Sequence, residues 1–265
     1  MLIALDIDGT IIDWSENLSE RVEAAIRGVV EAGHDVVLAT GRSLWGTTEV
    51  LQRLGLTTGW AVCSNGSVTL RLDPRRPGGY AIADVITFDP APALKLLREY
   101  LPDALYLVEG ADVEGDRLVT AAFPDGELTG PVRIVPFEDL LHRPATRVVV
   151  RSVEHTNEEF GELVAASGLH GVSYAVGWTA WLDLAPDGVS KASALDVVRA
   201  RLGVPREQTL AVGDGNNDLE MFAWAARAVA MGQAREDVRA AADEVTASIE
   251  DDGLALVLEP LLRAV

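Results

Sequence analysis

Cysteine is nearly absent from this chain, since Cys63 is the only one among 265 residues. A single cysteine cannot form an internal disulfide, and it cannot build a metal site from cysteines alone. Such usage is typical of proteins in a reducing compartment, so we expect a cytoplasmic protein. Cys63 itself is expected to be a small buried apolar residue.

Basic residues are also scarce. The chain has 22 Lys and Arg against 41 Asp and Glu, which gives a formal net charge of -19. This charge repels the phosphates of nucleic acids and of anionic membranes, and no cluster rich in Lys and Arg compensates for it locally. Nucleic acid and membrane are therefore not expected as partners.

Long apolar runs, repeats and paired histidines are missing as well. No segment reaches the roughly 20 apolar residues that a membrane helix needs, and no basic region precedes the first apolar stretch. We find neither an internal repeat nor a low-complexity segment. The histidines lack the paired spacing of a metal site: His34, His142, His155 and His170. Apolar residues, in contrast, make up 48% of the chain, which is enough for a sizeable core.

Strand and helix patterns alternate at both ends of the chain. The N-terminal part predicts strands at 1–5, 35–39 and 60–63 and helices between 19 and 33 and at 43–54. The C-terminal part predicts helices at 191–202, 218–226 and 254–262 and strands at 209–212 and 228–230. This rhythm predicts an α/β fold with a Rossmann-like parallel sheet and helices on both faces. Ligands of such sheets bind beyond the carboxyl ends of the strands.

The middle of the chain has a different pattern. Turns rich in Pro and Gly separate short segments rich in Val, Ile and Tyr, with helices expected at 91–101 and 157–167. Strands are expected at 148–150, 172–176 and 180–184, with a turn at Gly177-Trp178 between the last two. We therefore expect an inserted α+β cap domain with an antiparallel sheet at 85–183, and a discontinuous core domain formed by 1–84 and 184–265.

Two carboxylates follow the first predicted strand, in the sequence Asp6-Ile-Asp8-Gly-Thr. Residues i and i+2 of a strand point to the same side, and two like charges about 4 Å apart repel by roughly 1 to 4 kcal/mol. A divalent cation or a proton held by one of the pair offsets such repulsion. The alternative, a simple turn after a buried strand, becomes remote once the later motifs are considered.

Three further motifs lie at predicted strand ends or helix starts. They are Thr40-Gly41-Arg42, Lys191, and the run Gly213-Asp-Gly-Asn-Asn-Asp218. In a parallel sheet these positions converge on one crevice, where carboxylates, a hydroxyl, an amide and an ammonium suit Mg²⁺ and a phosphate group. Gly213-x-Gly215 lacks the third glycine of a dinucleotide site. Without the neighbouring motifs, Lys191 would be interpreted as a solvated lysine in the first turn of a helix. Arg42 is as compatible with a structural ion pair as with a substrate contact.

The ordered set of motifs resembles the haloacid dehalogenase-like phosphatases, specifically the Cof-type branch. Ser64-Asn-Gly66 and Val229-Ala-Met-Gly232 stand in family-like places, and the cap position also matches. The resemblance implies hydrolysis of a small phosphorylated metabolite, such as a sugar phosphate, with Mg²⁺ as cofactor. It makes Asp6 the nucleophile that forms an aspartyl phosphate, and Asp8 the general acid and base.

The same resemblance assigns the ligands. Metal ligands would be Asp6, the backbone carbonyl of Asp8, Asp214 and, directly or through water, Asp218. The phosphoryl group would be bound by Thr40, Gly41, Lys191 and Asn217. Trp45, Trp178 and Trp181 are expected to be packing residues rather than substrate contacts.

Two other functions remain open at this point. A phosphotransferase or mutase would pass the phosphoryl group to a second alcohol. A catalytically idle metabolite-binding module would lack an acid, whereas all four are present here. The sequence leaves the particular substrate and the oligomeric state open.

Overall fold

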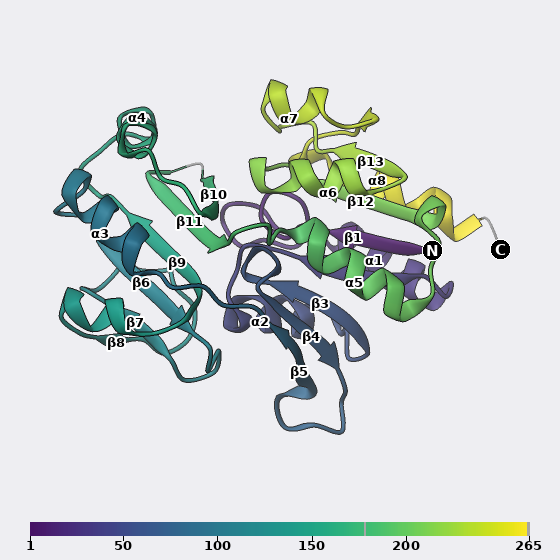
Figure 1. Cartoon of the computed structure of the whole chain (residues 1–265). Helices are drawn as coiled ribbons and strands as arrows, with labels where there is room; N and C mark the ends of the chain where they lie inside the picture. Colours follow the sequence, from purple (N-terminus) through teal and green to yellow (C-terminus); the bar gives the residue numbers. More distant parts are fainter. Residues whose placement is uncertain (178, 264–265) are drawn as a thin grey trace.

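The computed structural model describes residues 1–177 and 179–263, which form two sheets (Figure 1). The larger sheet has eight strands in the order β14-β13-β12-β1-β2-β3-β4-β5. Its strands are β1 (Leu2–Leu5), β2 (Asp35–Ala39), β3 (Gly59–Cys63), β4 (Val68–Leu72), β5 (Tyr80–Val85), β12 (Thr209–Gly213), β13 (Arg227–Ala230) and β14 (Glu244–Val245). Strands β1, β2, β3, β12, β13 and β14 run parallel, as the alternating pattern predicts.

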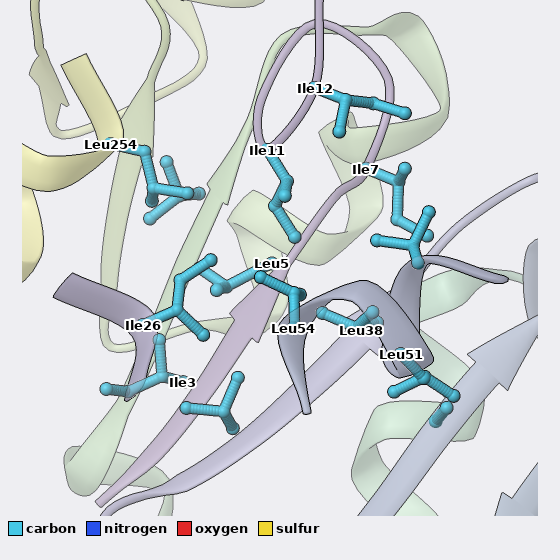
Figure 2. Close-up of a cluster of buried hydrophobic side chains, with 14 of the residues drawn as sticks. Ile3, Leu5, Ile7, Ile11, Ile12, Ile26, Leu38, Leu51, Leu54 and Leu254 are labelled. Atoms are coloured by element: carbon cyan, nitrogen blue, oxygen red, sulfur yellow. The ribbon is translucent and has the colours of Figure 1, made fainter. Parts of the chain in front are cut away.

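Helices cover both faces of this sheet. They are α1 (Glu20–Glu31), α2 (Leu44–Leu54) and α8 (Gly253–Leu258) on one face, and α5 (Lys191–Leu202), α6 (Leu219–Trp224) and α7 (Glu236–Ala240) on the other. Because side chains alternate along a strand, Ile3 and Leu5 pack with Ile26 and Leu54 on the first face (Figure 2). Leu2 and its neighbours face α5 and α6. Both faces of β1 are thus fully buried, which explains its uninterrupted apolar sequence.

The second sheet lies between β5 and α5 in the chain and has six strands in the order β10-β11-β9-β6-β7-β8. Its strands are β6 (Leu105–Gly110), β7 (Arg117–Val119), β8 (Arg133–Ile134), β9 (Ala145–Arg151), β10 (Val172–Val176) and β11 (Trp181–Pro186). All neighbouring strands are antiparallel except β7 and β8. Helices α3 (Ala91–Tyr100) and α4 (Asn157–Ser167) pack on one face, around Tyr106 and Phe160.

Some elements differ from the sequence prediction. The closing helix predicted at 254–262 is α8 followed by a 3₁₀ helix at Glu259–Arg263, because Pro260 cannot supply the backbone N–H of a continuing α-helix. The helix predicted at 218–226 begins with a 3₁₀ turn at Asn216–Asp218 and ends at Trp224. Strands β4 to β8 and β14, and the short α7, were not predicted. Trp178, placed in a predicted turn, lies outside the described residues.

Within residues 1–177 and 179–263, no helix has both the length and the apolar character needed to cross a bilayer.

Candidate active site

The carboxyl ends of β1, β2 and β12 meet at one edge of the larger sheet, because β1 lies between the other two strands. Asp6 follows β1 and donates its backbone N–H to the carbonyl of Val212 at 3.0 Å. Thr40 follows β2, and Asp214 follows β12. Residues about 200 positions apart in the chain are therefore neighbours, as the strand rhythm predicts.

Three buried carboxylates and one ammonium form the centre of this edge. Oxygens of Asp6, Asp214 and Asp218 lie within 4.8 Å of one another. The Nζ of Lys191 donates to Asp6 Oδ1 at 2.6 Å and to Asp218 Oδ1 at 2.7 Å. Lys191 has no exposed surface, although its chain position is the first turn of α5. The predicted residues thus meet, and the solvated alternative for Lys191 is wrong.

The charges of the cluster do not balance. Three carboxylates face one ammonium, which leaves a formal charge of about −2 when all are ionised. Burial chiefly, together with the Asp218, Asp214 and Asp8 carboxylates, raises the pKa of Asp6 well above its usual value, while Lys191 opposes the rise. Burial first, then the Asp218 and Asp8 carboxylates, raise the pKa of Asp214 to about 7 against the opposing effects of Lys191 and Gln233. The pKa of Lys191 lies above its usual value, because the Asp218 and Asp6 carboxylates outweigh the effect of burial. A divalent cation would remove the excess negative charge, so the donor set fits a hard metal ion.

Two glycines make room for the carboxylates. Gly9 has φ +76°, and a Cβ there would lie 2.1 Å from Asp214 Oδ2. A Cβ on Gly213 would lie 2.4 Å from the carboxyl group of Asp218. Any side chain at either position would push a carboxylate out of the cluster, and at Gly9 it would also be strained. The glycines of Asp-x-Asp-Gly and Gly-Asp-x-x-Asn-Asp therefore set the geometry of the site.

Asp218 organises the loop that carries Asp214. Its Oδ2 accepts backbone N–H bonds from Asp214 at 3.0 Å and from Gly215 at 2.9 Å. With Oδ1 bound to Lys191, both oxygens of Asp218 already accept hydrogen bonds. This carboxylate fixes the loop and Lys191 at the same time.

The remaining phosphate-binding candidates adjoin the cluster on the β2 side. Thr40 is fully buried, and Gly41 lies against the amide of Asn65, where a Cβ would meet Nδ2 and Oδ1 at 3.3 Å. The Nδ2 of Asn217 donates to Asn65 Oδ1 at 3.0 Å. Asn65 has φ +51°, a left-handed conformation that is uncommon for a non-glycine residue and is found at functional sites. It was not among the predicted site residues, although its Ser-Asn-Gly segment was noted.

Gly66 explains how that segment approaches α5. Its φ is +106°, and a Cβ would lie 2.2 Å from the carbonyl oxygen of Ser190. Ser190 caps α5 with its side chain, accepting from the N–H of Ser193. The close approach therefore places Lys191, the next residue, over the edge of the sheet.

Asp8 points to another partner. Its carboxylate accepts from Arg42 Nη2 at 2.6 Å and from Arg42 Nε at 3.0 and 3.1 Å. Arg42 therefore forms an ion pair rather than standing ready as an isolated charge, which is one of the two interpretations that the sequence allowed. The pairing itself could not be predicted.

Comparison with known proteins assigns the family. Residues 3–88 and 127–258 match the family model for the haloacid dehalogenase-like hydrolases. The chain belongs to this family, in its Cof-type branch. It is 27% identical to the phosphatase YwpJ of Bacillus subtilis, over 98% of this chain and 99% of that one. It is 29% identical to a phosphoglycolate phosphatase of Methanothermobacter thermautotrophicus, over 96% of this chain and 95% of that one.

Solved structures share the fold. The sugar phosphatase BT4131, of subclass IIB of the family, superposes with a TM-score of 0.80 at 23% identity, over 98% of both chains. A haloacid dehalogenase-like hydrolase from B. subtilis gives a TM-score of 0.79 at 23% identity, over 98% of this chain and 99% of that one. These likenesses extend to both sheets.

Gln233 also belongs to the site, although the sequence analysis did not predict it. Its Nε2 donates to the carbonyl of Gly9 at 2.5 Å and approaches Asp214 Oδ2 at 3.4 Å. Its Oε1 accepts from the N–H of Ile249 at 3.0 Å. The amide thus connects the Asp-Gly turn, Asp214 and the C-terminal segment. Only its place just after Val229-Ala-Met-Gly232 could have indicated this role.

The second sheet presents a charged face that was also not predicted. Glu109, Arg117 and Arg147 are buried on the face opposite its helices. Arg147 Nε donates to Asp183 Oδ1 at 2.6 Å, and Arg147 Nη1 lies 3.7 Å from Glu109 Oε1. Burial lowers the pKa of Arg147, but the carboxylates of Asp183, Glu109 and Asp8 raise it above its usual value. Strands β10 and β11 of the same sheet contact the segments Asn216–Asp218 and Ser64–Gly66, so this sheet lies beside the edge that carries the carboxylates.

Other contacts hold the two sheets together. Val113, in the loop between β6 and β7, packs into the core of the larger sheet, and Tyr80 of β5 donates to Glu114 Oε1 at 2.7 Å. Trp45 packs against Gly130, where a Cβ would lie 2.5 Å from the indole ring. Trp181 packs in the second sheet and donates to Asp183 Oδ2 at 2.9 Å. Trp45 and Trp181 are therefore packing residues here, as the sequence suggested.

Proposed function

We propose that this protein is a Mg²⁺-dependent phosphatase that hydrolyses a small phosphomonoester, such as a sugar phosphate, in the cytoplasm. The observation that carries the proposal is the cluster of Asp6, Asp214 and Asp218 around the buried Lys191 ammonium. Family membership supports hydrolysis, and the names of its relatives support phosphate esters as substrates. The single buried Cys63 is compatible with a reducing compartment.

The residues present suit Mg²⁺. Asp6, Asp214 and the backbone carbonyl of Asp8 would hold it, with Asp218 behind them to orient the loop and complete the acidic set. When bound, the ion would neutralise charge on the phosphoryl oxygens and on the carboxylates. The excess negative charge of the buried cluster supports this assignment.

The reaction would take two displacements at phosphorus. A carboxylate oxygen of Asp6 forms a bond to phosphorus while the bond to the leaving oxygen breaks, and Asp8 gives a proton to that oxygen. Asp8 then takes a proton from water as the water oxygen attacks phosphorus, and the bond to Asp6 breaks. Phosphate leaves, Asp6 is a free carboxylate again, and Asp8 has regained its proton.

Positioning of the phosphoryl group falls to four residues around Asp6. Lys191 would contribute a buried positive charge, while Thr40, Gly41 and Asn217 would contribute hydroxyl, backbone and amide groups. Phosphoryl transfer depends mainly on such positioning and on charge neutralisation. Asn65, which holds the amide of Asn217 at 3.0 Å, would orient it.

The second sheet would act as a cap that selects the substrate. We propose the inserted domain at 85–183 for this role, on a core formed by 1–84 and 184–265. Its face carries the ion-paired side chains of Arg147, Glu109 and Asp183, whose remaining donors and acceptors would line the space for the leaving group. Such a mixed lining suits a hydroxyl-rich leaving group better than a purely apolar one. Closure of a cap also excludes water from the reacting centre.

Phosphate release from a panel of phosphorylated metabolites, with Mg²⁺ and with EDTA, tests the proposal. Asp6→Asn should abolish release, and Asp103→Asn, an exposed aspartate beyond α3, is the matched control and should leave it unchanged. Retained turnover in Asp6→Asn would show that Asp6 is not the nucleophile. Transfer of phosphate to an added alcohol, instead of release to water, would indicate a phosphotransferase. Binding without turnover would indicate an idle module.

A further inference from the structure

Arg42 grips the carboxylate of Asp8 with two of its nitrogens. Nη2 lies 2.6 Å from Asp8 Oδ1, and Nε lies 3.1 and 3.0 Å from Oδ1 and Oδ2. The Asp8 side chain is 39% exposed, whereas that of Arg42 is only 16% exposed. A planar guanidinium that binds through two nitrogens fixes both the position and the plane of a carboxylate.

Arg42 is itself held by its surroundings. Its backbone N–H donates to Thr40 Oγ1 at 3.0 Å, and its carbonyl accepts from the N–H of Ser64 at 2.8 Å. Its methylene groups lie against Gly46 of α2, where a Cβ would meet Arg42 Cδ at 3.2 Å. The Arg42 side chain therefore runs across a part of α2 that a larger residue would crowd.

A second carboxylate completes the arrangement. Arg42 Nη2 also donates to Glu16 Oε1 at 2.5 Å. Glu16 has φ +63°, and its backbone carbonyl accepts from Arg53 Nη2 at 2.9 Å. Glu16 thus holds the same nitrogen, Nη2, that binds Asp8, and Arg53 holds the segment that carries Glu16.

Within residues 1–177 and 179–263, Arg42 is the residue that holds the Asp8 carboxylate by hydrogen bonds and an ion pair. The Asp8 side chain is partly exposed, so without a donor to hold its carboxylate it could turn toward water. Arg42 supplies the attraction that opposes this movement.

We propose that Arg42 is a positioning residue that holds the Asp8 carboxyl group in place for proton transfer to the leaving oxygen, with Glu16 as the brace of Arg42. The proposal rests on the proposed phosphatase function. A general acid contributes about 10²- to 10⁴-fold, and a displacement of about 1 Å costs up to about 10²-fold. The rival explanation is a tether that only joins residues 13–17 to α2.

The dependence of rate on the leaving group separates these roles. An alkyl phosphate such as glycerol 2-phosphate needs a proton on its leaving oxygen, while p-nitrophenyl phosphate has a good leaving group and needs it far less. Arg42→Ala should lower kcat/KM for the alkyl ester by ~10²-fold and for the aryl ester by ~10-fold or less. Arg42→Lys, which keeps the charge but not the planar fork, should fall between wild type and Arg42→Ala.

Arg75→Ala is the matched control, because Arg75 is exposed and forms its ion pair with Asp73 in the turn between β4 and β5. It should leave both rates unchanged. Glu16→Gln should also lower kcat/KM more for the alkyl ester than for the aryl ester, but by a smaller factor than Arg42→Ala. If Arg42→Ala does not fold, Glu16→Gln and Arg42→Lys test the proposal.

Equal losses for the two esters in the Arg42 variants would overturn the proposal, as would a selective loss in Arg75→Ala. A wild-type protein that hydrolyses neither ester would instead count against the phosphatase function itself. If the wild type is active and the Arg42 variants keep its ratio of kcat/KM for the two esters, only the proposed role of Arg42 is wrong.

Discussion

Replacing Asp214 by Asn should make the metal-free protein more stable at about pH 8. Burial and the neighbouring Asp218 carboxylate raise the pKa of Asp214 from 3.8 to about 7. Between these values the folded protein retains a proton that the unfolded chain has released. The free energy of unfolding therefore falls as the pH rises through this window, by ~1.4 kcal/mol per pH unit and by ~4 kcal/mol in total. Asn carries no charge at any pH and should escape this loss.

Urea unfolding followed by circular dichroism measures the effect, at several pH values from about 4 to 8, in EDTA and in saturating Mg²⁺. In EDTA, the difference between Asp214→Asn and wild type should approach ~4 kcal/mol near pH 8 and shrink toward zero near pH 4. Mg²⁺ should stabilise wild type by ~2.7 kcal/mol at a hundred times its dissociation constant. It should leave Asp214→Asn unchanged. Asp103→Asn should behave as wild type throughout.

Two results would refute this reasoning. If Asp214→Asn were less stable than wild type in EDTA near pH 8, the buried carboxylate would stabilise the fold, and the accounting of charge in the cluster would be wrong. If Mg²⁺ still stabilised the variant by the wild-type amount, Asp214 would not be a metal ligand.

Three other changes have defined outcomes. Gly9→Ala places a Cβ 2.1 Å from Asp214 Oδ2 at φ +76°, so it should lower phosphate release by ~10²-fold and weaken stabilisation by Mg²⁺; wild-type values would contradict the steric argument. Cys63 is buried, and burial chiefly raises the pKa of its thiol to about 12, so Ellman's reagent should react only after unfolding in urea; rapid reaction of the native protein would contradict this. Arg147→Ala should lower kcat/KM for the preferred metabolite by ~10-fold or more while p-nitrophenyl phosphate is less affected, as steady-state rates would show; equal losses would exclude a role in selection.

The centre of the site could be predicted because it depends on strand ends. Asp6, Thr40 and Asp214 each follow a buried apolar strand directly, and parallel strands carry such residues to one edge whatever the loops do. The role of Lys191 could be predicted only together with the other motifs, because its position in the first turn of a helix is compatible with a solvated side chain. The alternating core strands were predictable because each is a short, mostly buried and mostly apolar run between turn signals.

The missed features depend on tertiary packing. Nothing in the sequence links Arg42 to Asp8, or Gln233 to the carbonyl of Gly9, because these contacts join segments 34 and 224 positions apart. Strands β4 and β5 pair as a hairpin, and the partly or fully exposed residues of β5 give a weak pattern. The charged face of the second sheet places Glu109 opposite Arg147 only through the register of β6 and β9. Register of this kind is set by side-chain packing across strands.

The position of β1 has a consequence for synthesis on the ribosome. Leu2 of β1 pairs on one side with Asp35 and on the other with Thr209. At about 5 to 20 residues per second, the second neighbour emerges some 10 to 40 s after the first strand. During that interval the nascent polypeptide carries an apolar strand with one open edge, the kind of surface that invites mispairing. The inserted sheet prolongs this exposure, so newly made chains of this protein should depend on chaperones more than a molecule whose central strands are consecutive.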